Sequence, residues 1–249
     1  LKLVIQIPAY NEEKDIVSVL TKISKTYPKI DDVKIVLIDD GSTDNTRNYA
    51  APYVDKIIQH DKRLGLAKTF YSGVSWALED GADIIINLDG DGQYNPEEIP
   101  LVLDPVLSGS ADIVIGNRPI NDMPWFSLKK KGLQIFGTFI LNRIVGSTIN
   151  DYPCGFRVIS KKAASKLVFY TSYTYTIEMN ILSTYLKFNI DNVDITVNAP
   201  TRPSRLVKSN TQYILKAMES ALLSMMRYRK RRLFFQVIIL IGLILGCLN

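Results

Sequence analysis

Asp89 and Asp91 directly follow an apolar run at residues 84–88. If that run is a strand, alternate residues project to the same side, and both carboxylates stand exposed together at its end. Hard divalent ions such as Mg²⁺ and Mn²⁺ take oxygen ligands, often one or two carboxylates completed by substrate phosphates. Gln93 adds an amide oxygen. The pattern therefore predicts a metal site that could stabilise a diphosphate leaving group.

Two further polar clusters follow apolar runs. Residues 8–12 read Pro-Ala-Tyr-Asn-Glu, and residues 39–44 read Asp-Asp-Gly-Ser-Thr-Asp. Part of the second cluster would form a turn, with Thr43 or Asp44 capping the next helix. Two adjacent acids exceed what capping requires, and Asp39 is placed to accept hydrogen bonds from a base or a ribose.

These clusters need a scaffold that brings them together. Short apolar runs alternate with amphipathic stretches up to residue 116, which predicts an α/β fold with a doubly wound, mostly parallel sheet. In such a sheet, ligands bind at the carboxyl ends of the strands. The predicted strands cover residues 3–7, 33–38, 56–58, 84–88 and 112–115, and the predicted helices cover residues 12–25, 44–51, 67–78 and 96–107.

The pattern changes after residue 117. Residues 211–226 carry apolar side chains at helical spacing, which predicts an amphipathic helix that lies on a membrane or packs on the domain. No repeat and no long linker is visible, so residues 1–210 are expected to form one catalytic domain. The other elements expected here are a long helix at 127–145, a strand at 156–160, a helix at 176–187 and a strand at 193–197.

Basic charge is concentrated near the C-terminal end. The chain of 249 residues has a net charge of +5, and residues 227–232 read Arg-Tyr-Arg-Lys-Arg-Arg. Because the charge is local, nucleic acid is not expected as a partner. A basic cluster beside the apolar run 233–248 matches the positive-inside pattern and attraction to anionic lipid. We therefore expect residues 211–232 to form a juxtamembrane segment and residues 233–249 to form a transmembrane segment, which is either truncated or a short anchor. The catalytic domain is expected on the cytosolic side.

Several ligand classes are disfavoured by missing signatures. The two cysteines, Cys154 and Cys247, lie far apart, which argues against a disulfide framework or a zinc cluster. No Gly-x-Gly-x-x-Gly follows the first apolar run, and residues 62–69 lack the glycines of a P-loop. An EF-hand would need glycine at Tyr94 and glutamate at Pro100. Dinucleotide, P-loop and calcium sites are therefore not expected.

Six motifs follow one another between residues 3 and 210. They read Ile-Pro-Ala-Tyr-Asn-Glu-Glu at 7–13, Asp-Asp-Gly-Ser-Thr-Asp at 39–44, Gly-Leu-Ala at 65–67 with Gly73, Asp-Gly-Asp-Gly-Gln at 89–93, Gly-Asn-Arg at 116–118 and Asp-Tyr-Pro-Cys-Gly-Phe-Arg at 151–157. As a set they resemble family 2 glycosyltransferases, most closely the polyprenyl-phosphate branch typified by dolichol-phosphate mannose synthase. The resemblance implies a GT-A fold, inverting transfer from a nucleotide sugar, and Mg²⁺ or Mn²⁺ as cofactor.

The resemblance also implies functions for individual residues. The residues that would hold the nucleotide sugar are Pro8, Ala9, Tyr10, Glu12, Asp39 and Asp89. The metal ligands would be Asp89, Asp91 and Gln93, and the catalytic residues Asp91 and Arg118. The acceptor phosphate would contact Arg118, Lys130, Arg202, Arg205 and Ser209, and the motif closing the acceptor side includes Asp151 and Arg157. Residues 202–209 depart from the family's Arg and Gly-x-Ser-Lys signature, which leaves open which of them touches phosphate.

A phosphate acceptor fits the lack of an evident general base. A hydroxyl acceptor needs a base poised near neutral pH. The only histidine, His60, follows the third predicted strand, where a structural function is expected. A phosphate is already an anion and can attack the anomeric carbon directly when arginines and lysines position it. The expected reaction is hexose transfer from GDP-mannose, UDP-glucose or UDP-GlcNAc to a polyprenyl phosphate such as dolichyl phosphate, at the cytosolic membrane face.

Three alternatives compete with this interpretation. The first is a glycosyltransferase acting on a hydroxyl of a glycan or glycolipid. The second, a processive polysaccharide synthase, is disfavoured because neither Trp76 nor Trp125 lies in a Gln-x-x-Arg-Trp motif. The third, a membrane-tethered nucleotide-sugar-binding protein without catalysis, has no need of the intact carboxylate and amide set. The sequence leaves open which sugar, which nucleotide and which polyprenol are used. It also leaves open whether the apolar segment packs against a second copy in a homo-oligomer.

Overall fold

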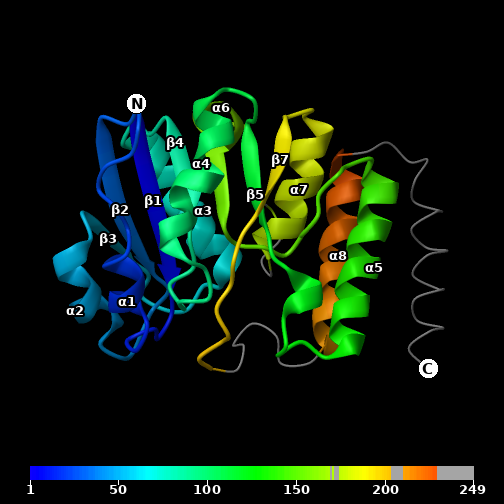
Figure 1. Cartoon of the computed structure of the whole chain (residues 1–249), viewed down its shortest axis with the longest axis horizontal. Coiled ribbons are helices and arrows are strands. Elements are labelled where there is room, and N and C mark those ends of the chain that lie inside the picture. Colours follow the sequence, from blue (N-terminus) through cyan, green and yellow to red (C-terminus); the bar gives the residue numbers. More distant parts are fainter. Residues whose placement is uncertain (169, 171–173, 203–209, 229–249) are drawn as a thin grey trace.

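The computed structural model describes residues 1–168, 170, 174–202 and 210–228. Within them the centre is a seven-stranded sheet in the order β3-β2-β1-β4-β6-β5-β7 (Figure 1). The strands are β1 (Lys2–Ala9), β2 (Asp32–Asp39), β3 (Lys56–Gln59), β4 (Ile84–Asn87), β5 (Ile113–Asn117), β6 (Arg157–Ser160) and β7 (Ile190–Asp194). All pairings are parallel except those of β6, which runs antiparallel to both β4 and β5. The predicted mostly parallel α/β sheet is confirmed, with β6 as its reversed member.

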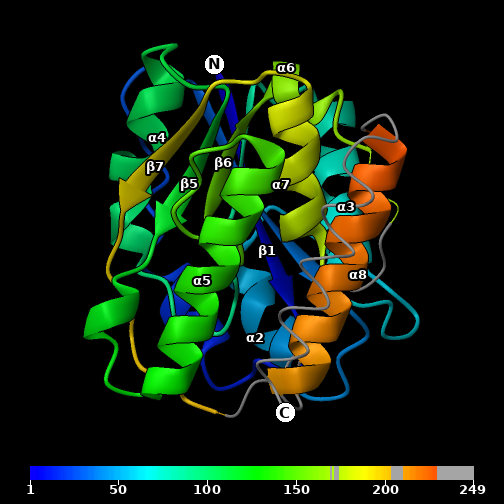
Figure 2. The ribbon, with the colours of Figure 1, turned by 90° about the vertical axis from the view of Figure 1, so that its right-hand side faces the viewer.

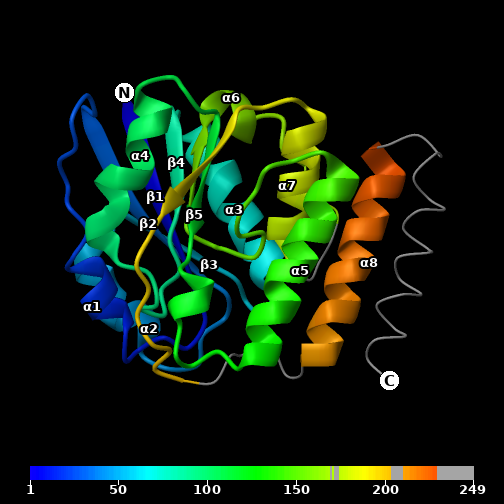
Figure 3. The same cartoon turned by 45° about the vertical axis from the view of Figure 1, so that its right-hand side comes forward.

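Helices cover both faces of the sheet. They are α1 (Ile16–Leu20), α2 (Thr46–Ala50), α3 (Leu66–Glu79), α4 (Ile99–Leu107), α5 (Leu128–Val145), α6 (Lys161–Ala164), α7 (Tyr175–Tyr185) and α8 (Asn210–Tyr228), with short 3-10 turns η1 (Ala51–Tyr53), η2 (Pro96–Glu98) and η3 (Ile120–Asp122). Helices α5, α7 and α8 lie on the same side of the sheet (Figure 2), and α5 and α8 run side by side beyond α7 (Figure 3). This pair of outer helices forms one wall of the cavity described below.

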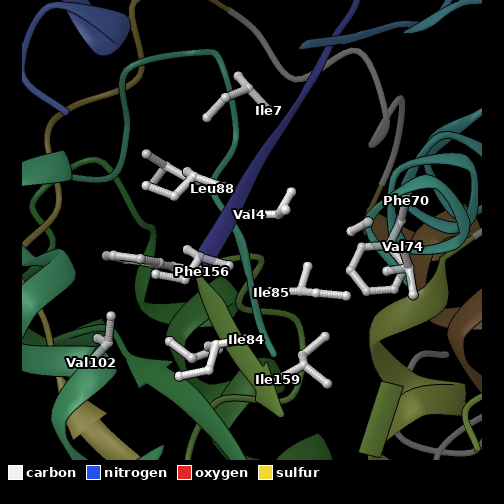
Figure 4. Packing of buried hydrophobic residues seen from close by; sticks show 14 of the residues in the cluster. Val4, Ile7, Phe70, Val74, Ile84, Ile85, Leu88, Val102, Phe156 and Ile159 are labelled. Atoms are coloured by element: carbon white, nitrogen blue, oxygen red, sulfur yellow. The ribbon is translucent and has the colours of Figure 1, made fainter. Parts of the chain in front are cut away.

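The core explains why the strands read as continuous apolar runs. Ile85 of β4 points toward Phe70 and Val74 of α3, whereas its neighbour Ile84 points to the opposite face, toward Val102 of α4 (Figure 4). All of these side chains are buried. Since both faces are covered, consecutive residues of the central strands are apolar rather than alternating with polar ones.

Two predicted elements differ from the structure. The helix expected at residues 12–25 is reduced to α1, because after Leu20 the backbone closes in i→i−3 bonds, from Lys22 to Val19 and from Ile23 to Leu20, each 3.3 Å long. The Ser24 hydroxyl then hydrogen-bonds with Thr26 in a local turn. The strand expected at 193–197 ends at Asp194, although apolar residues continue to Val197. Val197 instead forms an isolated bridge with Tyr94, so the chain leaves the sheet and crosses the loop after β4.

Helix α8 confirms the predicted amphipathic helix and packs on the domain. Ala221 and Met225 form a small apolar cluster with Ile177 and Ile181 of α7. Among the described residues, no helix is long and apolar enough to cross a membrane. The predicted transmembrane segment 233–249 lies outside the described residues and stays a prediction.

Candidate active site

A cavity of about 920 Å³ lies at the edge of the sheet where β1 and β4 end. Loops after β1, β2 and β4 line one part, and side chains of α5, α7 and α8 line the other. The predicted site residues that line it are Pro8, Ala9, Tyr10, Glu12, Asp89, Asp91, Gln93, Arg118, Lys130 and Arg202. Segments far apart in the sequence therefore meet at one site, because the carboxyl ends of parallel strands share one edge.

The loop after β4 presents the predicted metal ligands. Gly92 has a left-handed φ of +73°, which lets the chain turn sharply between Asp91 and Gln93. Gln93 donates from its backbone nitrogen to Asp91 Oδ1 at 3.1 Å and from Nε2 to Oδ2 at 2.5 Å. The turn thus holds a carboxylate and an amide against each other at the cavity wall.

The side chain of Asp89 is held in place by Asn87 and by close contact with Gly155. Asn87 Nδ2 lies 3.4 Å from Asp89 Oδ1 and donates to the carbonyl of Gly155 at 2.9 Å. A Cβ on Gly155 would lie 2.6 Å from Asp89 Oδ2, so only glycine leaves room for this carboxylate. Desolvation and the charge of Asp91 raise the pKa of Asp89 to about 7.

This donor set fits Mg²⁺ or Mn²⁺. Burial and the neighbouring charge of Asp91 raise the pKa of Asp89, and a divalent cation would neutralise the repulsion between the two carboxylates. No group of three or more His, Cys, Asp or Glu side chains that could hold a metal occurs in the described part of the chain. Asp89, Asp91 and Gln93 would therefore share the ion with oxygens of a substrate diphosphate, as Mg²⁺ sites commonly do.

The raised pKa of Asp89 predicts a pH-dependent stability of the metal-free protein. An unfolded aspartate has a pKa of about 3.9, so between about pH 4 and pH 7 the folded state binds more protons than the unfolded state. The free energy of unfolding then falls as pH rises through that window. We expect Asp89→Asn to remove this contribution, which denaturant titrations in EDTA at about pH 5 and about pH 8 would measure. If the free energy of unfolding depends on pH equally in the wild type and in Asp89→Asn, the raised pKa of Asp89 is contradicted.

Arg118 follows β5 and is held by a buried carboxylate. Its Nε and Nη2 donate to Asp151 at 2.6 and 3.0 Å, and Gln134 of α5 also donates to Asp151 at 3.0 Å. Burial alone would lower the pKa of Arg118, but Asp151 raises it well above its ordinary value. Desolvation and the charge of Arg118 lower the pKa of Lys130, whose Nζ lies 3.5 Å from the ring centre of Phe126. Two cations thus line the cavity together, an arrangement suited to an anionic substrate group.

The loop that follows β3 forms the other polar wall. The guanidinium of Arg63 stacks on the Tyr10 ring at 4.4 Å from its centre. Asp40 accepts hydrogen bonds from the backbone nitrogens of Leu64 and Gly65 at 2.7 and 2.9 Å. His60 lies 3.0 Å from both Asp40 Oδ1 and the Ser72 hydroxyl. His60 is thus part of a structural network that holds this loop, as expected, and it does not line the cavity.

Among the residues predicted to hold the nucleotide sugar, Asp39 is the one that does not line the cavity. Its side chain is fully buried, accepts from the Ser42 backbone nitrogen at 3.1 Å and lies 3.3 Å from Arg47 of α2. The next residue, Asp40, lines the cavity instead. Successive residues at a strand end face opposite sides, so an adjacent acidic pair could not show from sequence which member faces the site.

Only some of the residues predicted for the acceptor side line the cavity. Arg202 lines the cavity but forms an ion pair with Glu12, so two residues expected to bind different parts of the substrates contact each other. Arg205 and Ser209 lie outside the described residues. Arg157 does not line the cavity. It is fully buried and donates to the carbonyls of Tyr152 and Cys154 and to Asn180, so it fixes the loop before β6.

The sequence interpretation missed the apolar part of the cavity. Its lining comes from one face of α5 (Leu133, Phe136, Gly137, Ile140, Leu141, Ile144), from α7 (Tyr175, Thr176, Ile177) and from α8 (Ala217, Met218, Ala221, Met225). The spacing of three and four residues in α5 is visible in the sequence and indicates a helical stripe. Nothing in the sequence indicates that this stripe faces a cavity rather than a core.

The comparisons with known proteins agree with this geometry. Polyprenol monophosphomannose synthase of Mycolicibacterium smegmatis is 27% identical over 206 residues, covering 76% of this chain and 75% of that protein. UDP-N-acetylglucosamine–dolichyl-phosphate N-acetylglucosaminyltransferase of Methanococcus voltae is 30% identical over 212 residues, covering 76% and 82%.

A solved structure shares the fold. Glucosyl-3-phosphoglycerate synthase of Mycobacterium tuberculosis, determined with Mn²⁺, UDP and glucosyl-3-phosphoglycerate, superposes with a TM-score of 0.70 at 19% identity, covering 91% of this chain and 80% of that chain. The family model described as glycosyl transferase family 2 matches residues 4–168. These residues contain both the loop with the predicted metal ligands and the Arg118–Asp151 pair. The chain belongs to glycosyl transferase family 2.

Proposed function

We propose that the protein transfers a hexose from a nucleotide sugar to the phosphate of a polyprenyl lipid, with inversion at the anomeric carbon. The observation that carries the proposal is the continuity of the cavity from the Asp89–Asp91 loop to the apolar faces of α5 and α8. Arg118 and Lys130 line the same cavity, and Lys130 belongs to the helix whose next turns are apolar. A lipid phosphate combines the anionic head and the hydrocarbon tail that such a cavity would accept.

The carboxylates at the site favour a phosphate over a hydroxyl acceptor. Asp151 accepts from Arg118 and Gln134, and Glu12 is ion-paired with Arg202. Asp40 is engaged by two backbone nitrogens and by His60. The other two carboxylates at the cavity, Asp89 and Asp91, are the ones that would hold the metal ion. A hydroxyl would therefore require an engaged group or a metal ligand to take up a proton. A phosphate oxyanion requires none, since it is already charged at neutral pH.

The reaction then consists of alignment and charge stabilisation. Arg118 and Lys130 hold the acceptor phosphate, and one of its oxygens attacks the anomeric carbon as the bond to the nucleoside diphosphate breaks. Asp89, Asp91 and Gln93 would hold Mg²⁺ or Mn²⁺, which neutralises charge on the departing diphosphate. Attack on the face opposite the leaving group inverts the anomeric configuration. No proton has to be removed by the protein.

A polyprenyl lipid acceptor is also favoured by the names of the two relatives, one a polyprenol monophosphomannose synthase and the other a dolichyl-phosphate N-acetylglucosaminyltransferase. Exposed apolar side chains on α5 and α8 suit a membrane surface, where a lipid phosphate is found. They are Leu128, Ile135, Phe136 and Phe139 of α5 and Leu215, Leu223 and Met226 of α8. We propose the cytosolic face because the basic cluster at 227–232 precedes the apolar run.

The direct test is transfer of label into an organic phase. Detergent-solubilised protein is incubated with Mg²⁺ or Mn²⁺, with dolichyl or undecaprenyl phosphate, and with radiolabelled GDP-mannose, UDP-glucose or UDP-GlcNAc in parallel. We expect metal-dependent transfer with one of the donors, which identifies the sugar. Absence of lipid-linked product with every donor, together with transfer to a soluble sugar hydroxyl, would overturn the proposal in favour of a hydroxyl acceptor.

A further inference from the structure

Residues 195–202, which follow β7, form a strap across the polar loops of the cavity. In Figure 1 the strap is the gold segment that descends from the end of β7. Near its far end, Thr201 Oγ1 donates to Asp15 Oδ2 at 2.9 Å, and Arg202 is ion-paired with Glu12. The strap thus joins the last strand of the sheet to the loop after β1.

In its middle, the strap is bonded to the turn that carries the predicted metal ligands. Asn198 donates from its backbone nitrogen to the Gln93 carbonyl at 2.8 Å and from Nδ2 to the Gly92 carbonyl at 2.9 Å. The residue before it, Val197, forms the isolated bridge with Tyr94. One asparagine therefore holds the carbonyls of two successive residues of the turn.

The turn needs such support because its composition makes it flexible. Gly90 and Gly92 flank Asp91, and Gly92 has the left-handed φ of +73°. Within the turn, Gln93 donates to both oxygens of Asp91. That carboxylate is a predicted metal ligand, so a bound cation would compete with these bonds for the same oxygens. The bonds from Asn198 end on backbone carbonyls and involve no predicted ligand atom, so they can persist when the ion binds.

We propose that Asn198 is a positioning residue that holds the Asp91–Gln93 turn in the shape that binds the metal ion. The inference rests on the proposed function, because it takes Asp91 and Gln93 to bind the ion that neutralises the donor diphosphate. Asn198 does not line the cavity, so it acts through the turn and not on a substrate. A turn that is already held in place loses less conformational entropy when the ion binds, which raises the affinity for the ion.

The test variant is Asn198→Ala, and the strap supplies a matched control. Thr196 is exposed like Asn198, and its hydroxyl donates to Glu98 of η2 at 2.7 Å. Thr196→Val therefore removes one hydrogen bond between the strap and the domain without touching the turn. Neither variant removes a buried side chain, so both should unfold thermally close to the wild type. A difference in metal binding between them reports on the turn rather than on the attachment of the strap.

Mn²⁺ titration followed by electron paramagnetic resonance, without donor or acceptor, measures the effect directly. We expect Asn198→Ala to weaken the Mn²⁺ affinity about fivefold, which is the size of the net contribution of one hydrogen bond. Thr196→Val should change the affinity by less than about twofold. An unchanged Mn²⁺ affinity in Asn198→Ala, or an equal loss in both variants, would overturn the inference.

The metal dependence of sugar transfer separates positioning from a general structural defect. In Asn198→Ala, the Mn²⁺ concentration for half-maximal transfer should rise about fivefold. Saturating Mn²⁺ should restore kcat to within about twofold of the wild type, with KM for the acceptor unchanged. A kcat that stays low at saturating Mn²⁺ would contradict the assignment of Asn198 as a positioning residue.

The Mn²⁺ titration needs no acceptor, so failure of this inference and failure of the proposed function can be told apart. Weaker Mn²⁺ binding by Asn198→Ala than by Thr196→Val supports the inference, even if the wild type transfers no sugar to a lipid phosphate. Equal binding by the wild type and both variants, with transfer intact, would refute the inference and leave the proposed function standing. Absence of Mn²⁺ binding by the wild type would refute the inference as well.

Discussion

Asp91→Ala is expected to lower kcat by about a thousandfold, the upper range for losing a group that stabilises transition-state charge. Asp91 has a carboxylate oxygen within hydrogen-bond reach of Gln93 and faces the cavity close to Asp89. Its removal takes away the acceptor of both hydrogen bonds from Gln93 and a carboxylate that would bind the metal ion. Steady-state sugar transfer at saturating substrate measures the loss, and Mn²⁺ titration followed by electron paramagnetic resonance measures the accompanying drop in affinity.

The control for this variant is Asp122→Ala. Asp122 is an exposed acid of η3 that does not line the cavity, so its removal changes the net charge by the same amount. Thermal unfolding should place both variants close to the wild type. Activity retained by Asp91→Ala, or an equal loss in both variants, would contradict the metal-binding assignment.

Arg118→Ala is expected to affect both catalysis and stability. Loss of the guanidinium removes the cation that would hold the acceptor phosphate, and kcat/KM for the acceptor should fall by about a hundredfold or more. It also leaves Asp151, 1% exposed, without its cation. Breaking a buried pair on one side costs about 3–5 kcal/mol in the free energy of unfolding. Kinetics with varied acceptor and denaturant titration measure the two effects.

A double variant separates the two effects of Arg118. In Arg118→Met/Asp151→Asn both charges are absent, so no buried carboxylate is left unpaired and much of the lost stability should return. Activity should not return, because the phosphate still lacks its cation. Recovery of activity together with stability would show that Arg118 acts only by supporting the fold.

The sheet was predictable because its strands are short apolar runs between polar loops. The direction of β6 was not. The pattern of apolar and polar residues in β6 does not differ from that of a parallel strand. The direction of β6 is defined only by its pairing with β4 and β5. Strand β7 was expected at 193–197 but covers Ile190–Asp194, because the apolar residues up to Val197 continue the pattern while Val197 itself pairs with Tyr94. The local sequence indicates which strand residues are buried, whereas the tertiary fold determines which strands pair with one another.

The site was predicted best where adjacent residues act together. Asp89, Asp91 and Gln93 come from one turn after an apolar strand, and the structure places all three at the cavity. The choice between Asp39 and Asp40 depended on the direction of a side chain, which the sequence does not fix. The pairing of Arg118 with Asp151 joins segments 33 residues apart and needed the fold to be seen.

The reversed direction of β6 has a consequence for how the chain could diversify. Strand β5 ends and β6 begins at the same edge of the sheet, because the two are antiparallel neighbours. The excursion between them, which contains α5, therefore leaves and re-enters the sheet at one place, and the Arg118–Asp151 pair ties its two ends together. Long insertions between closely spaced anchors cost little loop-closure entropy. Evolution could lengthen, shorten or exchange this excursion without disturbing β1, β2 and β4, whose ends carry the other polar loops of the cavity.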